Sequence, residues 1–210
     1  MNTPTSTVMA EATHLGVSRE SWVRVEQFVT LLLQWQQRIN LISPGSIPHI
    51  WDRHVLDSLQ LLPLLPTGTN IFADLGSGSG FPALPLAIAS GQTVHLYESN
   101  LKKAAFLREA LRVTGCKGVV HSERLTGEAP ATACPRVDLV TARALASLTD
   151  LIGLAHPFMK SGAQALFLKG QDVDRELTDA QKYWRIQYTK HASLTDSLGV
   201  ILAVQEVTRV

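Results

Sequence analysis

One glycine-rich stretch constrains the fold of this chain more than any other part of its sequence. Residues 71–82 read I-F-A-D-L-G-S-G-S-G-F-P, so a short apolar run leads into Asp74, and three glycines follow at alternate positions: Gly76, Gly78 and Gly80. Glycine adopts positive φ and lets a ligand approach the bare backbone, so the pattern predicts a buried strand that turns sharply into a helix. Such turns lie at the carboxyl ends of strands, where open α/β sheets bind their ligands.

The chain after residue 69 alternates between strand-like and helix-like segments. Strands are expected over residues 70–75, 93–98, 118–121, 137–141, 163–169, 184–190 and 200–207. Helices are expected over 82–89, 101–114, 147–159 and 172–182, with a short or irregular piece near 125–131. This alternation predicts βαβ units and a parallel sheet, and the short loop between the last two strands favours an antiparallel pair.

The first 66 residues show helical spacing and no strand signal. Residues 1–17 are rich in Thr, Ser and Ala and are expected to form a flexible lead-in. Ser18 is a plausible N-cap for a helix that reaches about Ile39, and a second helix is expected over 47–62. The expected organisation is therefore a flexible N-terminus (1–17), a helical extension (18–66) and an α/β domain (67–210).

The near-zero net charge excludes binding to polyanions through the overall electrostatic field of the protein. Lys and Arg number 19 against 18 Asp and Glu, so a nucleic-acid partner would have to meet a local patch. Cys116 and Cys134 stand in no metal-ligand spacing, so neither a metal site nor a disulfide is predicted. The start lacks a signal-peptide pattern, and no apolar run reaches the roughly 18–20 residues that span a bilayer. We expect a cytoplasmic protein with no membrane contact, and a monomer.

The glycine spacing separates two classes of nucleotide-binding turn. A dinucleotide site would show G-x-G-x-x-G, whereas this chain has Asp74, one residue, and then G-x-G-x-G. This variant resembles the first motif of the methyltransferases that use S-adenosyl-L-methionine (AdoMet), although a tight strand–helix turn alone could produce it. Glu98 ends the next strand, 22 residues after Gly76, where an acid can accept hydrogen bonds from both ribose hydroxyls. A solvated strand end is the plainer alternative for Glu98.

Several further segments are similar to one family, the RsmG (GidB) methyltransferases that act on a guanine N7 of small-subunit (16S) ribosomal RNA. They are R-I-N-L-I (38–42), W-D-R-H-V-L-D-S-L (51–59), D-L-G-S-G-S-G-F-P-A-L-P-L-A-I (74–88), S-N-L-K-K-A-A-F-L-R-E (99–109), T-A-R-A-L-A-S-L (141–148) and F-L-K-G (167–170). The resemblance covers about residues 30–175. It implies a class I methyltransferase fold, with a Rossmann-like, mostly parallel seven-stranded sheet and an antiparallel last strand, behind an N-terminal helical extension.

The resemblance also implies an AdoMet site. Its residues would be Gly76, Gly78, Gly80, Phe81, Glu98, Arg124, Leu125 and Arg143. The chain departs from the family at Arg124 and Leu125, where the family usually has an acidic residue after a small one, so an adenine there would rely on backbone contacts. Asp74 is expected to steady the glycine loop and not to act as a catalyst.

A second group of residues is expected to meet RNA. These are Arg53, His54, Asp57 and Ser58 on the second helix, with Lys102 and Lys103. Asp57 and His54 could equally pin the extension to the sheet edge. A Ser-His-Asp hydrolase is excluded because residues on one helix face cannot assemble a triad. Guanine N7 carries a lone pair and no proton, so the reaction needs no general base, and Arg143 and Lys169 are expected to position the substrate.

Three other functions are alternatives to this one. An NAD-linked oxidoreductase would show the dinucleotide spacing and a catalytic Tyr-Lys or His-Arg pair, neither of which is evident. A non-catalytic RNA-binding or ribosome-assembly protein on the same fold is opposed by the intact glycine loop and Glu98. An AdoMet methyltransferase acting on another substrate is opposed only by the family-specific segments.

Overall fold

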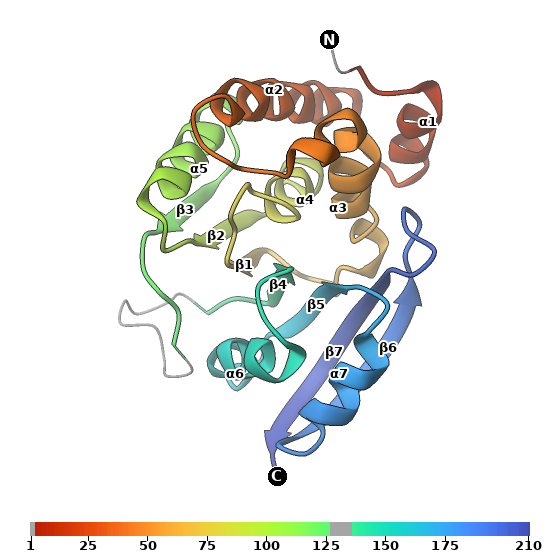
Figure 1. Cartoon of the computed structure of the whole chain (residues 1–210), viewed down its shortest axis with the longest axis vertical. Coiled ribbons are helices and arrows are strands. Elements are labelled where there is room, and N and C mark those ends of the chain that lie inside the picture. The colour runs from red at the N-terminus through yellow and green to blue at the C-terminus, as the bar shows by residue number, and fades with distance from the viewer. Residues whose placement is uncertain (1–2, 127–135) are drawn as a thin grey trace.

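The computed structural model describes residues 3–126 and 136–210 and folds them around one seven-stranded sheet (Figure 1). The strands are β1 (Ile71–Leu75), β2 (Thr93–Tyr97), β3 (Gly118–His121), β4 (Leu139–Arg143), β5 (Gln164–Lys169), β6 (Trp184–Ala192) and β7 (Val200–Arg209). Their order across the sheet is β3-β2-β1-β4-β5-β7-β6. Neighbouring strands are parallel except for β7, which is antiparallel to both β5 and β6. The expected mostly parallel sheet with an antiparallel last strand is confirmed.

The strand order reverses between β1 and β4. From β1 the chain moves to β2 and β3 on one side, and from β4 it moves to β5 on the other. Leu75 at the end of β1 lies opposite Tyr97 of β2 and Ala142 of β4. The segments that leave these three strands therefore start at one edge of the sheet, at the reversal point where open α/β sheets bind ligands.

Helices cover both faces of the sheet (Figure 1). One face carries α2 (Arg19–Gln36), α4 (Ala83–Ser90) and α5 (Leu101–Thr114), and the other carries α6 (Leu148–Met159) and α7 (Val173–Ala180). Successive strand residues point to opposite faces. Phe72 accordingly belongs to the core under α2, α4 and α5, whereas Ala73 and Leu75 belong to the core under α6.

The N-terminal segment differs from the expected flexible lead-in. Residues Ser6–His14 form helix α1, whose N-cap Thr5 accepts a hydrogen bond from the Val8 backbone N–H. Val8 and Ala12 are buried in the main core. The expectation failed because a short helix with only two buried side chains leaves a weak hydrophobic period, and its Thr and Ser content also suits a loop.

The second helix of the extension is irregular where a continuous helix was expected over 47–62. The structure has a 3₁₀ helix (Pro44–His49), a π-helical turn (Trp51–Leu56), one turn of α-helix, α3 (Asp57–Leu59), and a second 3₁₀ turn (Leu62–Leu64). Pro48 lies inside the first segment and lacks the N–H that an α-helix would use. π-turns of this kind are frequent at functional sites.

The extension packs directly on the α/β core. Phe28 of α2 is fully buried, and its ring centroid lies 5.2 Å from that of Phe81 just beyond the glycine loop. Hydrogen bonds also join α2 to the domain, from Ser21 Oγ to the Ile88 carbonyl at 3.1 Å and from Arg24 Nε to the Thr114 carbonyl at 2.6 Å. The extension therefore contributes to the wall behind the glycine loop.

Two remaining expectations concern the segment before β4. The irregular piece expected near 125–131 lies mostly outside the described residues. The strand expected over 137–141 is displaced by two residues, to Leu139–Arg143, which brings Arg143 to its carboxyl end. Within residues 3–126 and 136–210, every helix is too short or too polar to cross a membrane.

Candidate active site

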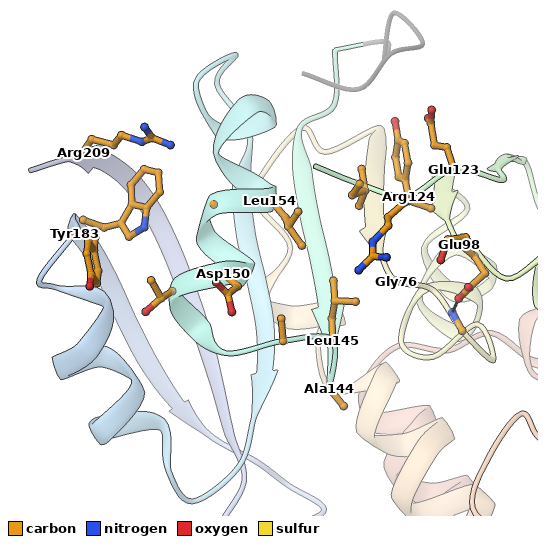
Figure 2. A pocket seen from close by; sticks show the side chains of 18 of the residues that line it. Gly76, Glu98, Glu123, Arg124, Ala144, Leu145, Asp150, Leu154, Tyr183 and Arg209 are labelled. Atoms are coloured by element: carbon orange, nitrogen blue, oxygen red, sulfur yellow. Dashed lines mark hydrogen bonds between the residues drawn. The ribbon is translucent and has the colours of Figure 1, made fainter. Parts of the chain in front are cut away.

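A cavity of about 1160 Å³ opens at the carboxyl ends of β1, β2 and β4. It is lined by Gly76, Gly78, Tyr97, Glu98, Ser99, Lys103, Glu123, Arg124, Leu125, Ala144, Leu145, Ala146, Thr149, Asp150, Gly153, Leu154, Lys182, Tyr183, Trp184, Arg209 and Val210. Figure 2 shows Gly76, Glu98 and Arg124 on one side of α6, and Tyr183 and Arg209 on the other. Five residues expected to bind the cofactor, including Arg124 and Leu125, thus meet in one cavity.

The three glycines of the loop have different surroundings. All three have positive φ, which disfavours other residues. A Cβ on Gly76 would collide with the Leu145 side chain, whereas a Cβ on Gly78 would meet only the Gly76 carbonyl oxygen, at 3.7 Å. A Cβ on Gly80 would lie 2.6 Å from Leu84 Cδ1, so this position lets the loop pack on α4. Gly78 therefore borders open cavity, whereas Gly80 does not line it.

Phe81 also differs from its expected role. It is 4% exposed and does not line the cavity. Its ring packs edge-on against Phe28 and stacks on His54 at 5.0 Å, and the Arg143 guanidinium lies 5.4 Å from its centroid. The sequence does not show whether a large apolar side chain beside a glycine loop faces a cavity or the core. Here Phe81 packs in the core next to the glycine loop.

Glu98 links the glycine loop to the start of α5. Its Oε2 accepts a hydrogen bond from the Gly78 N–H at 2.8 Å, and its Oε1 accepts one from the Asn100 N–H at 2.7 Å. Glu98 is only 9% exposed, so the solvated strand end is excluded. A carboxylate offers about four acceptor positions, and two of them remain for the hydroxyls of a ribose. This capacity and the open space beside Gly78 fit an AdoMet molecule.

Asn100 caps the helix that begins beside the first cavity. Its Oδ1 accepts hydrogen bonds from the Lys102 and Lys103 N–H groups and caps α5. An Asn directly before a helix is a recognisable cap signal. Lys103, expected to contact RNA, lines the first cavity instead, whereas Lys102 is exposed.

Asp74 supports the loop from inside the sheet, as expected. It is 1% exposed, its Oδ1 accepts a hydrogen bond from Thr141 Oγ1 at 2.6 Å, and its backbone carbonyl accepts one from Ser77 Oγ at 3.0 Å. Burial raises the pKa of Asp74 to about 7, against the hydrogen bonds from Thr141 and Ser77, which lower it. The group thus ties β1 to β4 at the point where the loop begins.

The stability of the fold is expected to fall with rising pH because of Asp74. Between pH 4 and 7 the folded chain keeps a proton that the unfolded chain, with a carboxyl pKa near 3.8, has lost. Asp74→Asn has no such titration, so its unfolding free energy relative to the wild type should rise across this window by on the order of 2–4 kcal/mol. Urea denaturation at pH 4.5, 5.5, 6.5 and 7.5 measures it. A difference that stays constant with pH would contradict the assignment.

A second cavity, of about 830 Å³, lies beside the first and shares Ala144 with it. Its lining is Ser43, Ser46, His49, Asp52, Arg53, His54, Asp57, Arg143, Ala144, Leu168, Lys169, Gly170, Glu176, Ser193, Thr195, Asp196, Gly199, Val200 and Ile201. Ala144 has φ of 50°, an uncommon conformation for a non-glycine residue that is often found at functional sites. The segment after β4 therefore forms the boundary between two cavities.

Arg143 lines the second cavity and not the first, which differs from its expected place in the cofactor site. One terminal nitrogen of its guanidinium lies 3.1 Å from Asp57 Oδ2 and 3.2 Å from the Arg53 carbonyl oxygen. Burial lowers the pKa of Arg143, and the Asp57 carboxylate opposes that shift. The side chain is therefore held in one place as a partly buried cation.

Asp57 joins three distant parts of the chain. Besides Arg143, it accepts hydrogen bonds on Oδ1 from Gln60 Nε2 at 2.7 Å and Thr195 Oγ1 at 2.9 Å. Gln60 in turn accepts a hydrogen bond from the Leu194 N–H at 2.7 Å. Sequence reasoning missed Gln60 and Thr195 because Gln60 contacts Leu194 and Thr195 contacts Asp57. The two residues of each pair are more than 130 positions apart in the chain.

The other two residues expected to meet RNA from this helix are turned inward. Ser58 is fully buried and donates to the His54 carbonyl at 2.6 Å, so its hydroxyl faces the interior and not the cavity. His54 stacks on Phe81, and burial and the nearby Arg143 and Arg53 charges lower its pKa to about 4. His54 is therefore neutral near pH 7.

Lys169 is also held more tightly than a surface lysine. Its Nζ lies 2.7 Å from Glu176 Oε2 and donates to the Ala146 carbonyl at 3.3 Å. Glu176 Oε2 also accepts the Leu148 N–H at 2.6 Å. Glu176, which the sequence analysis did not single out, therefore fixes the one expected substrate-positioning lysine at the second cavity.

Known proteins resemble this chain over most of its length. A protein of Bradyrhizobium sp. (strain ORS 278) called ribosomal RNA small subunit methyltransferase G is 51% identical over 197 residues, which cover 92% of this chain and 88% of the relative. A protein of the same name from Paramagnetospirillum magneticum is 47% identical and covers 94% of each chain. Among solved structures, the O-methyltransferase from Bacillus cereus in complex with SAH shares the fold, with a TM-score of 0.54 at 14% identity, over 85% of this chain and 90% of that one.

The family model described as GidB, rRNA small subunit methyltransferase G, matches residues 22–202. This range includes the glycine loop, Glu98, Asp57, Arg143 and Lys169. The chain belongs to the GidB family of rRNA small subunit methyltransferases.

Proposed function

We propose that this protein transfers a methyl group from AdoMet to N7 of a guanine in small-subunit ribosomal RNA. The observation that carries the proposal is the cavity in which the Glu98 carboxylate bridges the glycine loop and the start of α5. Family membership and relatives called ribosomal RNA small subunit methyltransferase G support the RNA substrate. The choice of guanine N7 rests on the family resemblance in the sequence.

We propose that the first cavity holds AdoMet. Glu98 would accept the ribose hydroxyls, the Gly76–Gly78 backbone would face the methionine part, and Arg124 and Leu125 would border the adenine. AdoMet would supply a methyl group already activated on a sulfonium. The protein then has to hold the acceptor atom about 3 Å away and in line, which is a task of positioning.

RNA would approach across the second cavity. Arg53 is exposed at its rim and Lys102 is exposed beside the first cavity, so both are placed to contact phosphates. His54 and Asp57 would act indirectly, through Phe81 and Arg143 respectively. We further propose that the protein acts as a monomer in the cytoplasm, where bacterial ribosomal RNA is found, and light scattering on purified protein tests the first part.

Two measurements test this function together. Calorimetric titration should show saturable binding of AdoMet and none of NAD⁺. Tritium transfer from labelled AdoMet onto small-subunit RNA, followed by mass spectrometry of the nucleosides, should yield N7-methylguanosine. Saturable NAD⁺ binding would contradict the cofactor, and AdoMet binding without transfer to this RNA would favour another substrate or a non-catalytic assembly role.

Lys169→Ala is expected to lower methyl transfer by about 10- to 100-fold and to change AdoMet affinity by less than about threefold, because the lost group is a charge-assisted hydrogen-bond donor at the second cavity only. Single-turnover rates and calorimetry measure the two effects. Lys190→Ala is the matched control, since Lys190 makes an exposed ion pair with Asp174 and lines neither cavity. Equal losses of rate and AdoMet affinity would refute the role.

A further inference from the structure

The Lys169–Glu176 pair keeps hydrogen-bonding capacity that its contacts within the protein do not use. An ammonium has three N–H donors, and Lys169 directs two of them, toward Glu176 Oε2 and the Ala146 carbonyl oxygen. Glu176 Oε2 receives Lys169 and the Leu148 N–H, while its Oε1 has no hydrogen-bond or ion-pair partner among the described residues. One donor and one acceptor therefore remain side by side, and both residues line the second cavity.

Asp57 provides an instructive contrast in the same cavity. Both of its carboxylate oxygens are engaged, Oδ1 by Gln60 and Thr195 and Oδ2 by Arg143. Asp57 is therefore a structural junction with little capacity for a ligand. Glu176 is fixed through one oxygen and 25% exposed at its side chain, so it is held in place and still accessible.

A donor beside an acceptor selects among nucleobases. Guanine presents O6, an acceptor, next to N1–H, a donor, which complements the free Lys169 N–H and Glu176 Oε1. Adenine and cytosine present a donor next to an acceptor in the reverse order, which would place an amino group against the ammonium and a lone pair against the carboxylate. Uracil shares the guanine pattern but has no N7 to methylate. Enzymes that modify bases commonly read a base that is out of its stack through this edge.

We propose that the second cavity receives the target base and that Glu176, with Lys169, reads the O6 and N1–H edge of guanine. This inference rests on the proposed function and adds a specificity-determining residue to it. Leu168, Val200 and Ile201 supply the apolar part of the lining, so the cavity combines apolar walls with a few fixed polar groups, as ligand sites generally do. With O6 and N1–H held at Lys169 and Glu176, N7, which lies next to O6 on the adjacent edge of the purine, is left free to face Ala144 and the first cavity.

The test compares two bases that differ mainly in this edge. The guanosine that the wild type methylates in small-subunit RNA is first located by mass spectrometry. Ligated RNAs then carry either guanosine or 2,6-diaminopurine riboside at that position. The second base keeps the purine shape and N7 but reverses the donor and acceptor at positions 6 and 1. The wild type should prefer guanosine by about 100-fold or more in kcat/KM.

Glu176→Gln should reduce this preference by about tenfold or more, because the amide can donate to the N1 of diaminopurine and no longer repels its lone pair. The intrinsic reactivities of the two N7 atoms cancel when the ratio is compared between variants. Asp174→Asn on the same helix is the matched control, because Asp174 lies outside both cavities in an exposed ion pair. It should keep the wild-type preference.

A purely structural role for Glu176 predicts a different result. If Glu176 only holds Lys169 in place, Glu176→Gln slows both RNAs equally and leaves the ratio unchanged, which would overturn the inference. A wild type that methylates both RNAs at similar rates would overturn it without any variant. Absence of methyl transfer to any small-subunit RNA would remove the proposed function itself, and the inference with it.

Discussion

Gly78→Asp is expected to weaken AdoMet binding by at least about 100-fold. Gly78 has φ of 53°, its N–H donates to Glu98 Oε2 at 2.8 Å, and the space beside it opens into the first cavity. An Asp side chain would occupy that space and place a second carboxylate near Glu98, the group that we propose binds the ribose. Because the side chain takes up space that the cofactor needs and its charge disturbs the Glu98 carboxylate, we expect a loss of about 3 kcal/mol in binding free energy, which corresponds to about 100-fold in Kd. Calorimetric titration with AdoMet measures it.

The control for Gly78→Asp is Gly91→Asp. Gly91 also has positive φ, 74°, and an added Cβ there meets no atom within 4 Å. It caps the end of α4 and lines neither cavity, so it carries the same backbone cost without the cofactor effect. Both variants carry the backbone cost of a positive φ, Gly78→Asp loses further stability through its charge near Glu98, and only Gly78→Asp should lose AdoMet binding. Normal AdoMet affinity in folded Gly78→Asp would place the cofactor elsewhere.

Arg143→Met is expected to abolish most methyl transfer and to destabilise the fold. The substitution leaves the Asp57 carboxylate without its cation, and breaking this partly buried ion pair is expected to cost on the order of 3 kcal/mol at most. It also removes the guanidinium that lies over the Phe81 ring and lines the second cavity. Because displacement of a positioning group by about 1 Å can cost about 100-fold in rate, we expect a loss of that size or larger in single-turnover methyl transfer. AdoMet affinity should change by less than about threefold.

The expected result distinguishes two placements of Arg143. The structure has it at the second cavity, whereas the family resemblance implied that it binds the cofactor. A cofactor ligand would lose AdoMet affinity in step with rate, and that result would return Arg143 to the first cavity. Arg185→Met is the matched control, since Arg185 is exposed on β6 and lines neither cavity. Rates should be compared below the unfolding midpoint of the least stable variant, as measured by thermal denaturation followed by circular dichroism.

The sequence predicted those parts of the fold that depend on local pattern. The alternation of apolar runs and turn residues placed the seven strands to within two residues at nearly every end, because strand and helix periods are local properties. The helix α1 was missed because its burial depends on α1 meeting the irregular helix around Trp51, a contact that no local pattern records.

The candidate site also contains residues that the sequence predicted and residues that it did not. Gly78 and Glu98 were predictable because the glycine turn and the acid at the next strand end have a fixed spacing. The burial of Ser58 and Phe81 was not predictable, since residue type alone does not reveal on which side of a helix or loop the cavity lies. Glu176 was missed because its partner Lys169 reaches it only after the chain has turned from β5 into α7.

The contacts of Asp57 have a consequence for how the protein becomes active during synthesis. Asp57 pairs with residues 86 and 138 positions later in the chain, Arg143 and Thr195. The chain leaves the ribosome from its N-terminus, a domain folds as a unit, and contacts between distant residues are slow to close. Asp57 therefore stays incompletely paired until the loop between β6 and β7 has emerged. The first cavity is also lined by Arg209 of β7, so neither cavity is complete before β7 has been made and has joined the sheet.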